Sequence, residues 1–331
     1  MTVRVAIEDD TQVGEARRTA ATLARRAALP EEQAGRLAIV VNELGSNLRK
    51  HAGKGELLFN ELLEGRRTGV EVLSIDRGKG MHLPDSLQDG RSTAGTRGEG
   101  LGAVRRLSGE FDAWSFPEKG AVVLSRLWSD GRGAEGALQL SGVCLPLASE
   151  QQSGDAWEAQ QLSPALWRVL LVDGLGHGPL AARAADEAQR AFRQTQGKAG
   201  PEAILHDLHA ALRSTRGAAL AVTELDLVTR TLRHGGIGNI SATVETPGQK
   251  ARGLLSHSGI AGQEARRLQE LTFPFPARSV LVLHSDGLAT QWKLEAYRGA
   301  QSCHAAVLAG LLYRDFRRPN DDSTVVVIKE P

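Results

Sequence analysis

Aromatic residues are scarce in this 331-residue sequence, where they make up only 4% of the chain. The net charge is also small, at +1 from 40 basic and 39 acidic residues. The sequence therefore shows neither the stacking surfaces nor the basic patch with which proteins bind nucleic acid. We expect its partners to be proteins or small molecules.

Long apolar runs are missing as well. No window approaches the ~20 apolar residues of a membrane-spanning helix, and the start, Met1-Thr2-Val3-Arg4-Val5, lacks the apolar run of a signal peptide. The only two cysteines, Cys144 and Cys303, have no metal-site spacing and form no disulfide framework. We expect a cytoplasmic protein whose thiols are reduced and structural.

The remaining composition is that of an ordinary globular protein. Hydrophobic residues make up 41% and charged residues 24% of the chain, which argues against long disorder. Because one hydrophobic core rarely organises more than about 250–300 residues, the length favours two domains.

Residues 1–128 predict a sandwich of helices on a sheet. Residues 14–28 are rich in Ala and Arg with a helical period, and Pro30-Glu31-Glu32 begins a second helix. Strands are predicted at 56–63, 70–75 and 120–128.

A glycine-rich segment, SDGRGAEG at 129–136, has no periodicity and predicts a flexible linker. We place the domain boundary there, between domains 1–128 and 137–331. In the second domain we predict strands at 169–172, 218–227, 279–283 and 324–328, and helices at 179–194 and 201–214. The fold class that follows is α/β with two domains.

The second predicted helix carries polar residues four positions apart, at Glu43, Asn47 and His51. This spacing places them on one helical face. A carboxylate and an amide oxygen one turn apart can act as a general base and as an oxygen ligand for Mg²⁺. Such a stripe is also typical of a solvated helix face, so alone it does not define a site.

Two glycine-rich segments follow. In Asp76-Arg77-Gly78-Lys79-Gly80-Met81, the Asp can accept the exocyclic amine of a base while glycines let the backbone approach the purine. Gly98-Glu99-Gly100-Leu101-Gly102 leads into a helix, whose N-terminus is a ready site for phosphates. Each segment alone is also compatible with a simple turn.

In this order and spacing, the three segments resemble the N, G1 and G2 boxes of the GHKL ATPases, and especially the RsbT-like anti-sigma-factor serine kinases. The resemblance covers nearly all of residues 1–128 and implies a Bergerat-type α/β sandwich that binds ATP and Mg²⁺. It implies Glu43 as catalytic base, Asn47 as Mg²⁺ ligand and Asp76 as adenine reader. The nucleotide would be lined by Gly78, Gly80, Gly98, Gly100, Leu101 and Gly102. Glu99 departs from the pattern, because these kinases often have a neutral residue there.

Four acidic motifs mark the second domain. They are Ser153-Gly154-Asp155, Asp173-Gly174-Leu175-Gly176-His177-Gly178, His284-Ser285-Asp286-Gly287 and Asn320-Asp321-Asp322-Ser323-Thr324. Any one Asp-Gly pair is also a common hairpin signal. Carboxylates gathered at strand ends, however, can bridge two hard cations that activate water for attack on a phosphoryl group. Oxygen ligands without a Cys/His cluster favour Mg²⁺ or Mn²⁺ over zinc.

These motifs resemble the metal-dependent PPM protein phosphatases, in particular their SpoIIE and RsbX-like branch. The resemblance covers about residues 137–329 and implies an α-β-β-α sandwich. It implies that Asp155, Asp173, Asp286 and Asp321 bind two Mn²⁺ or Mg²⁺ ions with the carbonyl of Gly174. Among these residues we expect Asp173 and Asp286 to be essential for catalysis.

Further residues near these motifs have open roles. His177 is predicted either to contact phosphate or a metal-bound water, or simply to cap or pack at the following helix. Asn239 and His257 also match recurrent features of the phosphatase branch but receive no role. We expect Asp322 to lie behind the metal site and not on it.

The combined resemblance implies a bifunctional regulator acting on phosphoserine or phosphothreonine of STAS-domain antagonists, as found in partner-switching or stressosome systems. Two alternatives stay open: a phosphatase whose first domain only senses nucleotide, and a non-catalytic module that binds a sigma-factor regulator. The sequence does not identify the oligomeric state.

Overall fold

The computed structural model describes residues 2–86, 100–133, 136–195, 197, 200–265 and 267–331. They group into two compact units. The first comprises the chain up to the 134–135 gap together with Leu294–Leu311, and the second comprises the rest. The domain limits from the sequence stay a prediction; they assign Leu294–Leu311 to the C-terminal domain, whereas packing groups it with the first unit.

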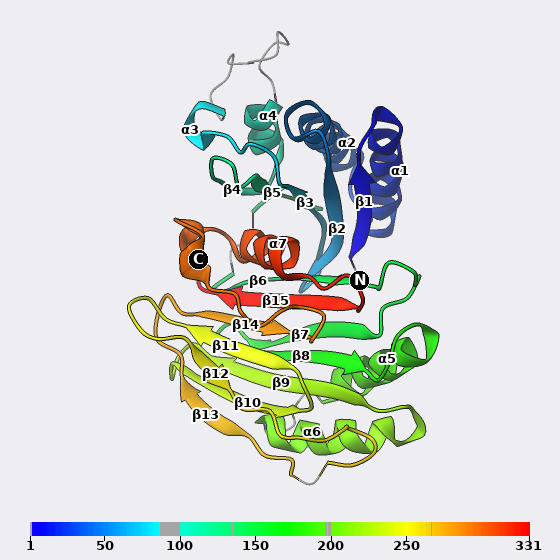
Figure 1. Cartoon of the computed structure of the whole chain (residues 1–331), viewed down its shortest axis with the longest axis vertical. Coiled ribbons are helices and arrows are strands. Elements are labelled where there is room, and N and C mark those ends of the chain that lie inside the picture. Colours follow the sequence, from blue (N-terminus) through cyan, green and yellow to red (C-terminus); the bar gives the residue numbers. More distant parts are fainter. Residues whose placement is uncertain (1, 87–99, 134–135, 196, 198–199, 266) are drawn as a thin grey trace. The chain divides into compact units, whose positions relative to one another are not determined.

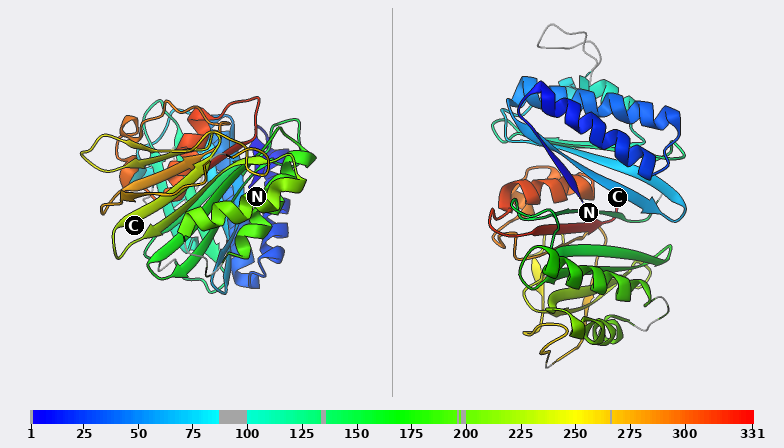
Figure 2. Two further views of the ribbon diagram at one scale, coloured as in Figure 1. Left: turned by 90° about the horizontal axis from the view of Figure 1, so that it is seen from below. Right: turned by 90° about the vertical axis from the view of Figure 1, so that its right-hand side faces the viewer.

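The first unit is built on a five-stranded antiparallel sheet in the order β1-β2-β3-β5-β4. Its strands are β1 (Val3–Ile7), β2 (Gly55–Glu64), β3 (Arg67–Asp76), β4 (Glu110–Ser115) and β5 (Ala121–Trp128). The helices are α1 (Asp10–Arg26), α2 (Glu31–Asn47), the short α3 (Leu83–Ser86) and α4 (Gly100–Leu107). Figure 2 shows α1 and α2 lying across one face of this sheet. β4 and α3 were not among the predicted elements.

Local sequence explains where the two long helices begin. Asp9 accepts hydrogen bonds from the backbone N–H of Thr11 and Gln12, and Gln12 accepts one from the backbone of Asp9. This capping box satisfies amides that have no partner within α1. Pro30 precedes α2, whose apolar residues Leu37, Val40, Val41 and Leu44 face the core against the sheet.

The last turn of α2 is followed by a π-helical turn, Leu48–Ala52. The predicted regular spacing of Glu43, Asn47 and His51 therefore stops at Asn47. Widened turns of this kind occur frequently at functional sites.

Leu294–Leu311 is held in the first unit by specific contacts. It contains the 3₁₀ turns Leu294–Ala296 and Ala300–Ser302 and the start of α7 (Ala305–Phe316). The Trp114 indole donates to the carbonyl oxygen of Arg298 at 3.1 Å, and the backbone N–H of His304 donates to Asp112. Tyr297 packs edge-on against Trp114 with ring centroids 5.6 Å apart.

The linker segment is also engaged in the first unit. Arg67 forms an ion pair with Asp130 and donates to the carbonyl oxygens of Arg132 and Gly133. Ser129 donates its backbone N–H to Thr68. The described part of the predicted flexible linker is thus tied to β3.

The second unit is a sandwich of two five-stranded sheets, in the orders β13-β10-β9-β8-β7 and β12-β11-β14-β15-β6. The strands of the first sheet are β7 (Asp155–Ser163), β8 (Leu166–Gly174), β9 (Ala218–Asp226), β10 (Thr231–Ile237) and β13 (Leu271–Pro274). Those of the second are β6 (Gln139–Leu145), β11 (Ser241–Glu245), β12 (Arg252–Leu254), β14 (Val280–His284) and β15 (Ser323–Lys329).

The two sheets share a buried apolar core that includes Leu171, Leu283 and Val326. Helices α5 (Pro179–Arg193) and α6 (Gly200–Ala211) cover the outer face of the β7–β10 sheet, as Figure 1 shows. A 3₁₀ turn, Leu212–Ser214, leads from α6 toward β9. No helix among the described residues is both long and apolar enough to cross a membrane.

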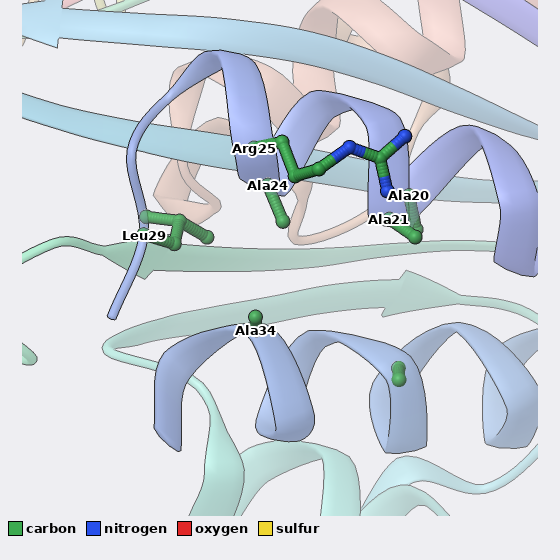
Figure 3. Close-up of a pocket in the computed structure, with 7 residues that line it drawn as sticks. Ala20, Ala21, Ala24, Arg25, Leu29 and Ala34 are labelled. Carbon is green, nitrogen blue, oxygen red and sulfur yellow. The ribbon is translucent and has the colours of Figure 1, made fainter. Parts of the chain in front are cut away.

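A small cavity of about 230 Å³ lies between α1 and α2. It is lined mostly by alanine side chains, with Arg25 at one side, as shown in Figure 3. It lies at the N-terminal half of α2, whereas Glu43 and Asn47 occupy the C-terminal half. This cavity is therefore separate from the predicted nucleotide residues.

Candidate functional sites

The first candidate site lies where α2, the turn after β3 and the start of α4 meet. Asn47, at the end of α2, faces Gly100, the first residue of α4: both polar side-chain atoms of Asn47 lie 3.7 Å from the position of a Cβ on Gly100. The structure thus brings together the predicted Mg²⁺ ligand and the phosphate-binding helix start. Glu43 is half-buried one turn earlier on α2.

Asp76 ends β3 and organises the following turn. Its Oδ1 accepts a hydrogen bond from the backbone N–H of Gly78 at 2.7 Å. Gly78 lies against Ala52, the last residue of the π-helical turn. Gly80 lies against the carbonyl group of Phe116. Because the Asp76 side chain already holds this turn, adenine would have to share the carboxylate with the backbone.

The glycine-rich segment before α4 is described only in part. Gly100, Leu101 and Gly102 form the first turn of α4, with Leu101 and Gly102 buried. Gly98 and Glu99 lie outside the described residues, so the structure does not place the beginning of the predicted phosphate loop.

The second candidate site gathers the four predicted metal-binding aspartates at one end of the sandwich. Asp155 at the start of β7 is paired in register with Asp173 at the end of β8. Asp286 follows β14 and Asp321 precedes β15, and these two strands are paired so that His284 lies opposite Val325. All four carboxylates thus come from strand ends that meet.

Hydrogen bonds connect the two sheets at this point. The Ser285 hydroxyl donates to Asp155 Oδ2 at 2.6 Å, and Asn239 Nδ2 donates to Asp286 Oδ2 at 2.7 Å. Asp322 accepts from the backbone N–H groups of Leu147 and Gly154, at 2.6 and 2.7 Å. Asp322 therefore connects the loop before β15 to the segments at Leu147 and Gly154. Its place behind a metal site stays a prediction.

Two glycines permit the close approach of these loops. A Cβ on Gly174 would lie 2.3 Å from the carbonyl oxygen of Ala181, and one on Gly287 would lie 1.7 Å from that of Asp322. Since real Cβ atoms do not approach a carbonyl oxygen so closely, only glycine fits at either position.

The electrostatics of the cluster favour a bound cation. Burial, together with the charges of Asp155 and Asp286, raises the pKa of Asp173, and burial followed by the charges of Asp322 and Asp321 raises the pKa of Asp155. Burial and the charge of Asp286 raise the pKa of Asp321. In the described parts of the chain, none of the four metal-site aspartates forms an ion pair with a basic side chain.

Carboxylate oxygens without a cationic partner are the donors that Mg²⁺ and Mn²⁺ prefer. The residues therefore fit such ions. Among the described residues, however, no three acidic, His or Cys side chains already stand together at coordinating positions.

The neighbouring histidines have defined partners. His177 Nδ1 lies 2.9 Å from Glu150 Oε1, and α5 begins at Pro179 without any side-chain cap, so His177 does not cap that helix. His284 is buried, with Nδ1 against the carbonyl oxygen of Ser285 and Nε2 accepting from the Trp292 indole. His257 pairs through its backbone with Gly236 and Gly238.

Sequence reasoning passed over Ser285. Its place between His284 and Asp286 in the third motif was a visible signal, but the direction of its hydroxyl toward Asp155 depends on the pairing of the sheets. Asn239 was noticed without a role, and its hydrogen bond to Asp286 supplies one.

The fold and the two sites define an ATPase-like domain of the histidine-kinase type joined to a PP2C-type phosphatase domain. Comparisons with known proteins agree. The profile described as stage II sporulation protein E (SpoIIE) matches residues 163–331, just over half of the chain, and the histidine kinase-like ATPase domain profile matches residues 7–126. The chain belongs to the SpoIIE family.

Several individual relatives match only part of the chain. The serine/threonine-protein kinase RsbT of Bacillus subtilis is 31% identical over 96 residues, which is 28% of this chain and 71% of RsbT. A structure from work titled "The bacterial stressosome: a modular system that has been adapted to control secondary messenger signaling" is 26% identical with a TM-score of 0.53. The match covers 58% of this chain and 99% of the chain in that structure.

RsbX in complex with magnesium is 18% identical with a TM-score of 0.52, and the match covers 59% of this chain and 96% of RsbX. At that identity the likeness concerns the fold alone. The predicted α/β fold class is confirmed, with an ATPase-like N-terminal domain and a PP2C-type C-terminal domain. Phosphatases of this family are metal-dependent, and the ATPase-like domains bind ATP.

Proposed function

We propose that this protein is a bifunctional partner-switching regulator. Its C-terminal domain removes phosphate from phosphoserine or phosphothreonine, and its N-terminal domain binds ATP and phosphorylates serine or threonine. The observation that carries the phosphatase assignment is the cluster of four strand-end aspartates, which are buried or half-buried and have no basic partner among the described residues.

In the phosphatase site, Asp155, Asp173, Asp286 and Asp321 with the Gly174 carbonyl would hold two Mn²⁺ or Mg²⁺ ions. When bound, such ions stabilise the charge of a phosphoryl group and activate water for in-line attack. The chain's own contribution is positional: Ser285 orients the Asp155 carboxylate and Asn239 orients that of Asp286.

In the ATPase-like site, Asp76 would accept the adenine amine and Asn47 would bind Mg²⁺ next to the start of α4. Glu43, half-buried one turn from Asn47, would take the proton of the attacking hydroxyl. The N-terminus of α4 at Gly100 supplies backbone N–H groups for the phosphates.

As substrates we propose STAS-domain regulatory proteins of the anti-sigma antagonist or stressosome type. Support comes from the relative named as the serine/threonine-protein kinase RsbT and from the stressosome-related structure. A protein that uses ATP and such partners would act in the cytoplasm.

A second candidate is a phosphatase whose N-terminal domain senses nucleotide without transferring phosphate. It is favoured by Asp76, which already holds its own turn through Gly78 and would have to share its carboxylate with adenine. A third candidate, a non-catalytic binder of a sigma-factor regulator, does not account for the clustered aspartates.

The test is incubation of the intact protein with phosphorylated and unphosphorylated STAS proteins, with and without ATP and Mn²⁺, read by intact mass. We expect an ~80 Da loss from the phosphoprotein that requires Mn²⁺, and an ~80 Da gain on the unphosphorylated protein that requires ATP, since phosphorylation replaces one hydrogen with PO₃. If mass is lost from the phosphoprotein but none is gained by the unphosphorylated protein, the nucleotide-sensing phosphatase is favoured. If neither mass change is seen, the non-catalytic binder is favoured.

A further inference from the structure

Arg216 lies beside the turn that follows the metal-site residue Asp173. Its Nη1 atom is 3.4 Å from the position that a Cβ on Gly176 would occupy. The same turn is attached to the other metal-site strand, because Gly174 donates its backbone N–H to Gly154, the neighbour of Asp155. The guanidinium group therefore lies beside the turn that connects the ends of the strands carrying Asp155 and Asp173.

The backbone around Arg216 is fixed from several sides. Leu175 donates its N–H to the carbonyl oxygen of Gly217 at 3.0 Å, and Gln263 Nε2 donates to the carbonyl oxygen of Arg216 at 2.5 Å. Gly217 N–H is in turn bonded to the Thr215 hydroxyl at 3.0 Å. The position of Arg216 is thus set by the phosphatase fold itself.

The guanidinium group of Arg216, in contrast, has no interaction partner among the described residues. Within the described chain, Arg216 forms no ion pair and its side chain donates no hydrogen bond. Other arginines of this unit, such as Arg168 and Arg233, are engaged by Glu224. The neighbouring His177 is occupied by Glu150. Arg216 is therefore an exposed cation on a fixed backbone, beside the turn that follows Asp173.

We propose that Arg216 binds the phosphoryl oxygens of the substrate. A phosphate monoester carries close to two negative charges near neutral pH, and a cationic side chain beside the proposed metal site would offset part of that charge. The planar guanidinium fork matches two phosphate oxygens and needs no proton uptake. This inference deepens the proposed phosphatase function and rests on it.

The test compares the intact protein with Arg216→Ala, Arg216→Lys and Arg213→Ala. Arg213 is an exposed arginine one turn earlier in the Leu212–Ser214 turn and acts as the matched charge control. Steady-state kinetics with Mn²⁺ use p-nitrophenyl phosphate and a phosphoserine-containing STAS protein, and orthophosphate is titrated as a product inhibitor. Thermal unfolding checks that each variant is folded.

Losing a charged hydrogen-bond pair should raise the KM for p-nitrophenyl phosphate and the inhibition constant of orthophosphate about 10- to 100-fold in Arg216→Ala. Arg216→Lys should recover part of this loss, and Arg213→Ala should match the wild type. Wild-type constants in a folded Arg216→Ala would overturn the proposal. A raised KM for the phosphoprotein alone would overturn it too, because Arg216 would then contact the partner's surface.

Calorimetric titration with orthophosphate and Mg²⁺ separates this inference from the proposed function. If the wild type showed no metal-dependent turnover, the phosphatase assignment would fail. Orthophosphate binding weakened about tenfold or more by Arg216→Ala would nevertheless support an anion site at Arg216. Equal orthophosphate binding by the wild type and Arg216→Ala would overturn the proposal for Arg216.

Discussion

At the scale of single residues, the four metal-site aspartates differ in their surroundings. Asp155 accepts a hydrogen bond from the Ser285 hydroxyl, and Asp286 accepts one from the Asn239 amide. Asp173, in contrast, is surrounded by other carboxylates. Burial and these like charges raise the pKa of Asp173, and a bound cation would offset the same charges.

Replacement of Asp173 or Asp286 tests the metal assignment. We expect Asp173→Asn or Asp286→Asn to lower Mn²⁺-dependent phosphate release by several orders of magnitude with the fold intact, because each removes an oxygen charge that the cations need. EDTA should have the same effect on the wild type. The exposed Asp186→Asn on α5 is the control. Wild-type hydrolysis by either site variant would contradict the assignment.

Replacing the two acidic residues of the ATPase-like site should impair two different steps, ATP binding and phosphate transfer. Asp76→Asn should weaken ATP binding, since the carboxylate both holds the Gly78 turn and is placed to accept the adenine amine. Glu43→Ala should bind ATP normally and lose phosphate transfer. Calorimetry and phosphoryl-transfer assays measure the two effects, and loss of ATP binding in Glu43→Ala would mean that its role is wrongly assigned.

At the scale of helices and strands, the sequence predicted most elements with strong periodicity. The observed β3, β8 and β15 begin and end within a few residues of the predicted limits, and α2 begins where it was predicted to begin. β10 was missed because it contains His234 and two glycines, and β13 because it has four residues and ends in a proline. The long helix α7 was missed because it is apolar on nearly all sides and has no amphipathic period.

The site was predictable to the extent that it lies in short motifs. Asp155, Asp173, Asp286 and Asp321 each lie in such a motif, and the structure brings them together. The directions of Ser285 and Arg216 were not predictable, because each depends on neighbours from a distant strand or loop.

The turn between β14 and the metal site should be intolerant of any side chain. In Gly287→Ala the new Cβ would collide with the carbonyl oxygen of Asp322, so we expect a loss of about 1–3 kcal/mol or more in the free energy of unfolding. Phosphatase activity should fall as the two loops separate. Gly253→Ala on β12, which has open space around it, should be close to neutral in denaturant unfolding. Equal stability of the two variants would show that the loops can move apart at no cost.

Strand β4 offers a test based on pH. Burial alone would raise the pKa of Glu110, but the hydrogen bond with His304 and the charge of Arg126 lower this pKa to about 2. Since the folded pKa is depressed, the stabilisation is present above the unfolded value near 4.5 and is lost as pH falls toward 2. It amounts to on the order of 3 kcal/mol at neutral pH.

Glu110→Gln should therefore be less stable than the wild type at pH 7, and the difference should shrink as the pH is lowered below 4.5. Denaturant unfolding followed by tryptophan fluorescence measures this difference. Glu15→Gln, an exposed change on α1, is the control. A difference that stays constant down to pH 3 would rule out the charge of Glu110 as its cause.

At the scale of the whole molecule, the candidate residues of the two sites are connected through the chain. Asp286 and Asp321 flank a stretch that includes Leu294–Leu311, and this segment belongs to the unit that carries Asp76 and Asn47. A change in the ATPase-like unit on nucleotide binding can thus act on the backbone that joins two metal-site residues.

We therefore expect nucleotide to change the phosphatase rate of the intact protein. Allosteric coupling of this kind typically amounts to about 5- to 150-fold. The rate on one phosphoprotein should be measured with ATP, with ADP and without nucleotide, and Asp76→Asn should remove the differences. Equal rates under all three conditions would leave separate protein targets as the explanation for two opposed activities in one chain.

The placement of Leu294–Leu311 also decides how the protein can be divided. The backbone passes between the units three times, so the second unit is interrupted in sequence by Leu294–Leu311. A fragment starting near Ala137 keeps Leu294–Leu311 but loses Trp114 and Asp112, against which Arg298 and His304 are bonded. Reduced activity of such a fragment would have two explanations, the loss of these contacts and the loss of the nucleotide-binding residues. Substitutions within the intact chain distinguish the two.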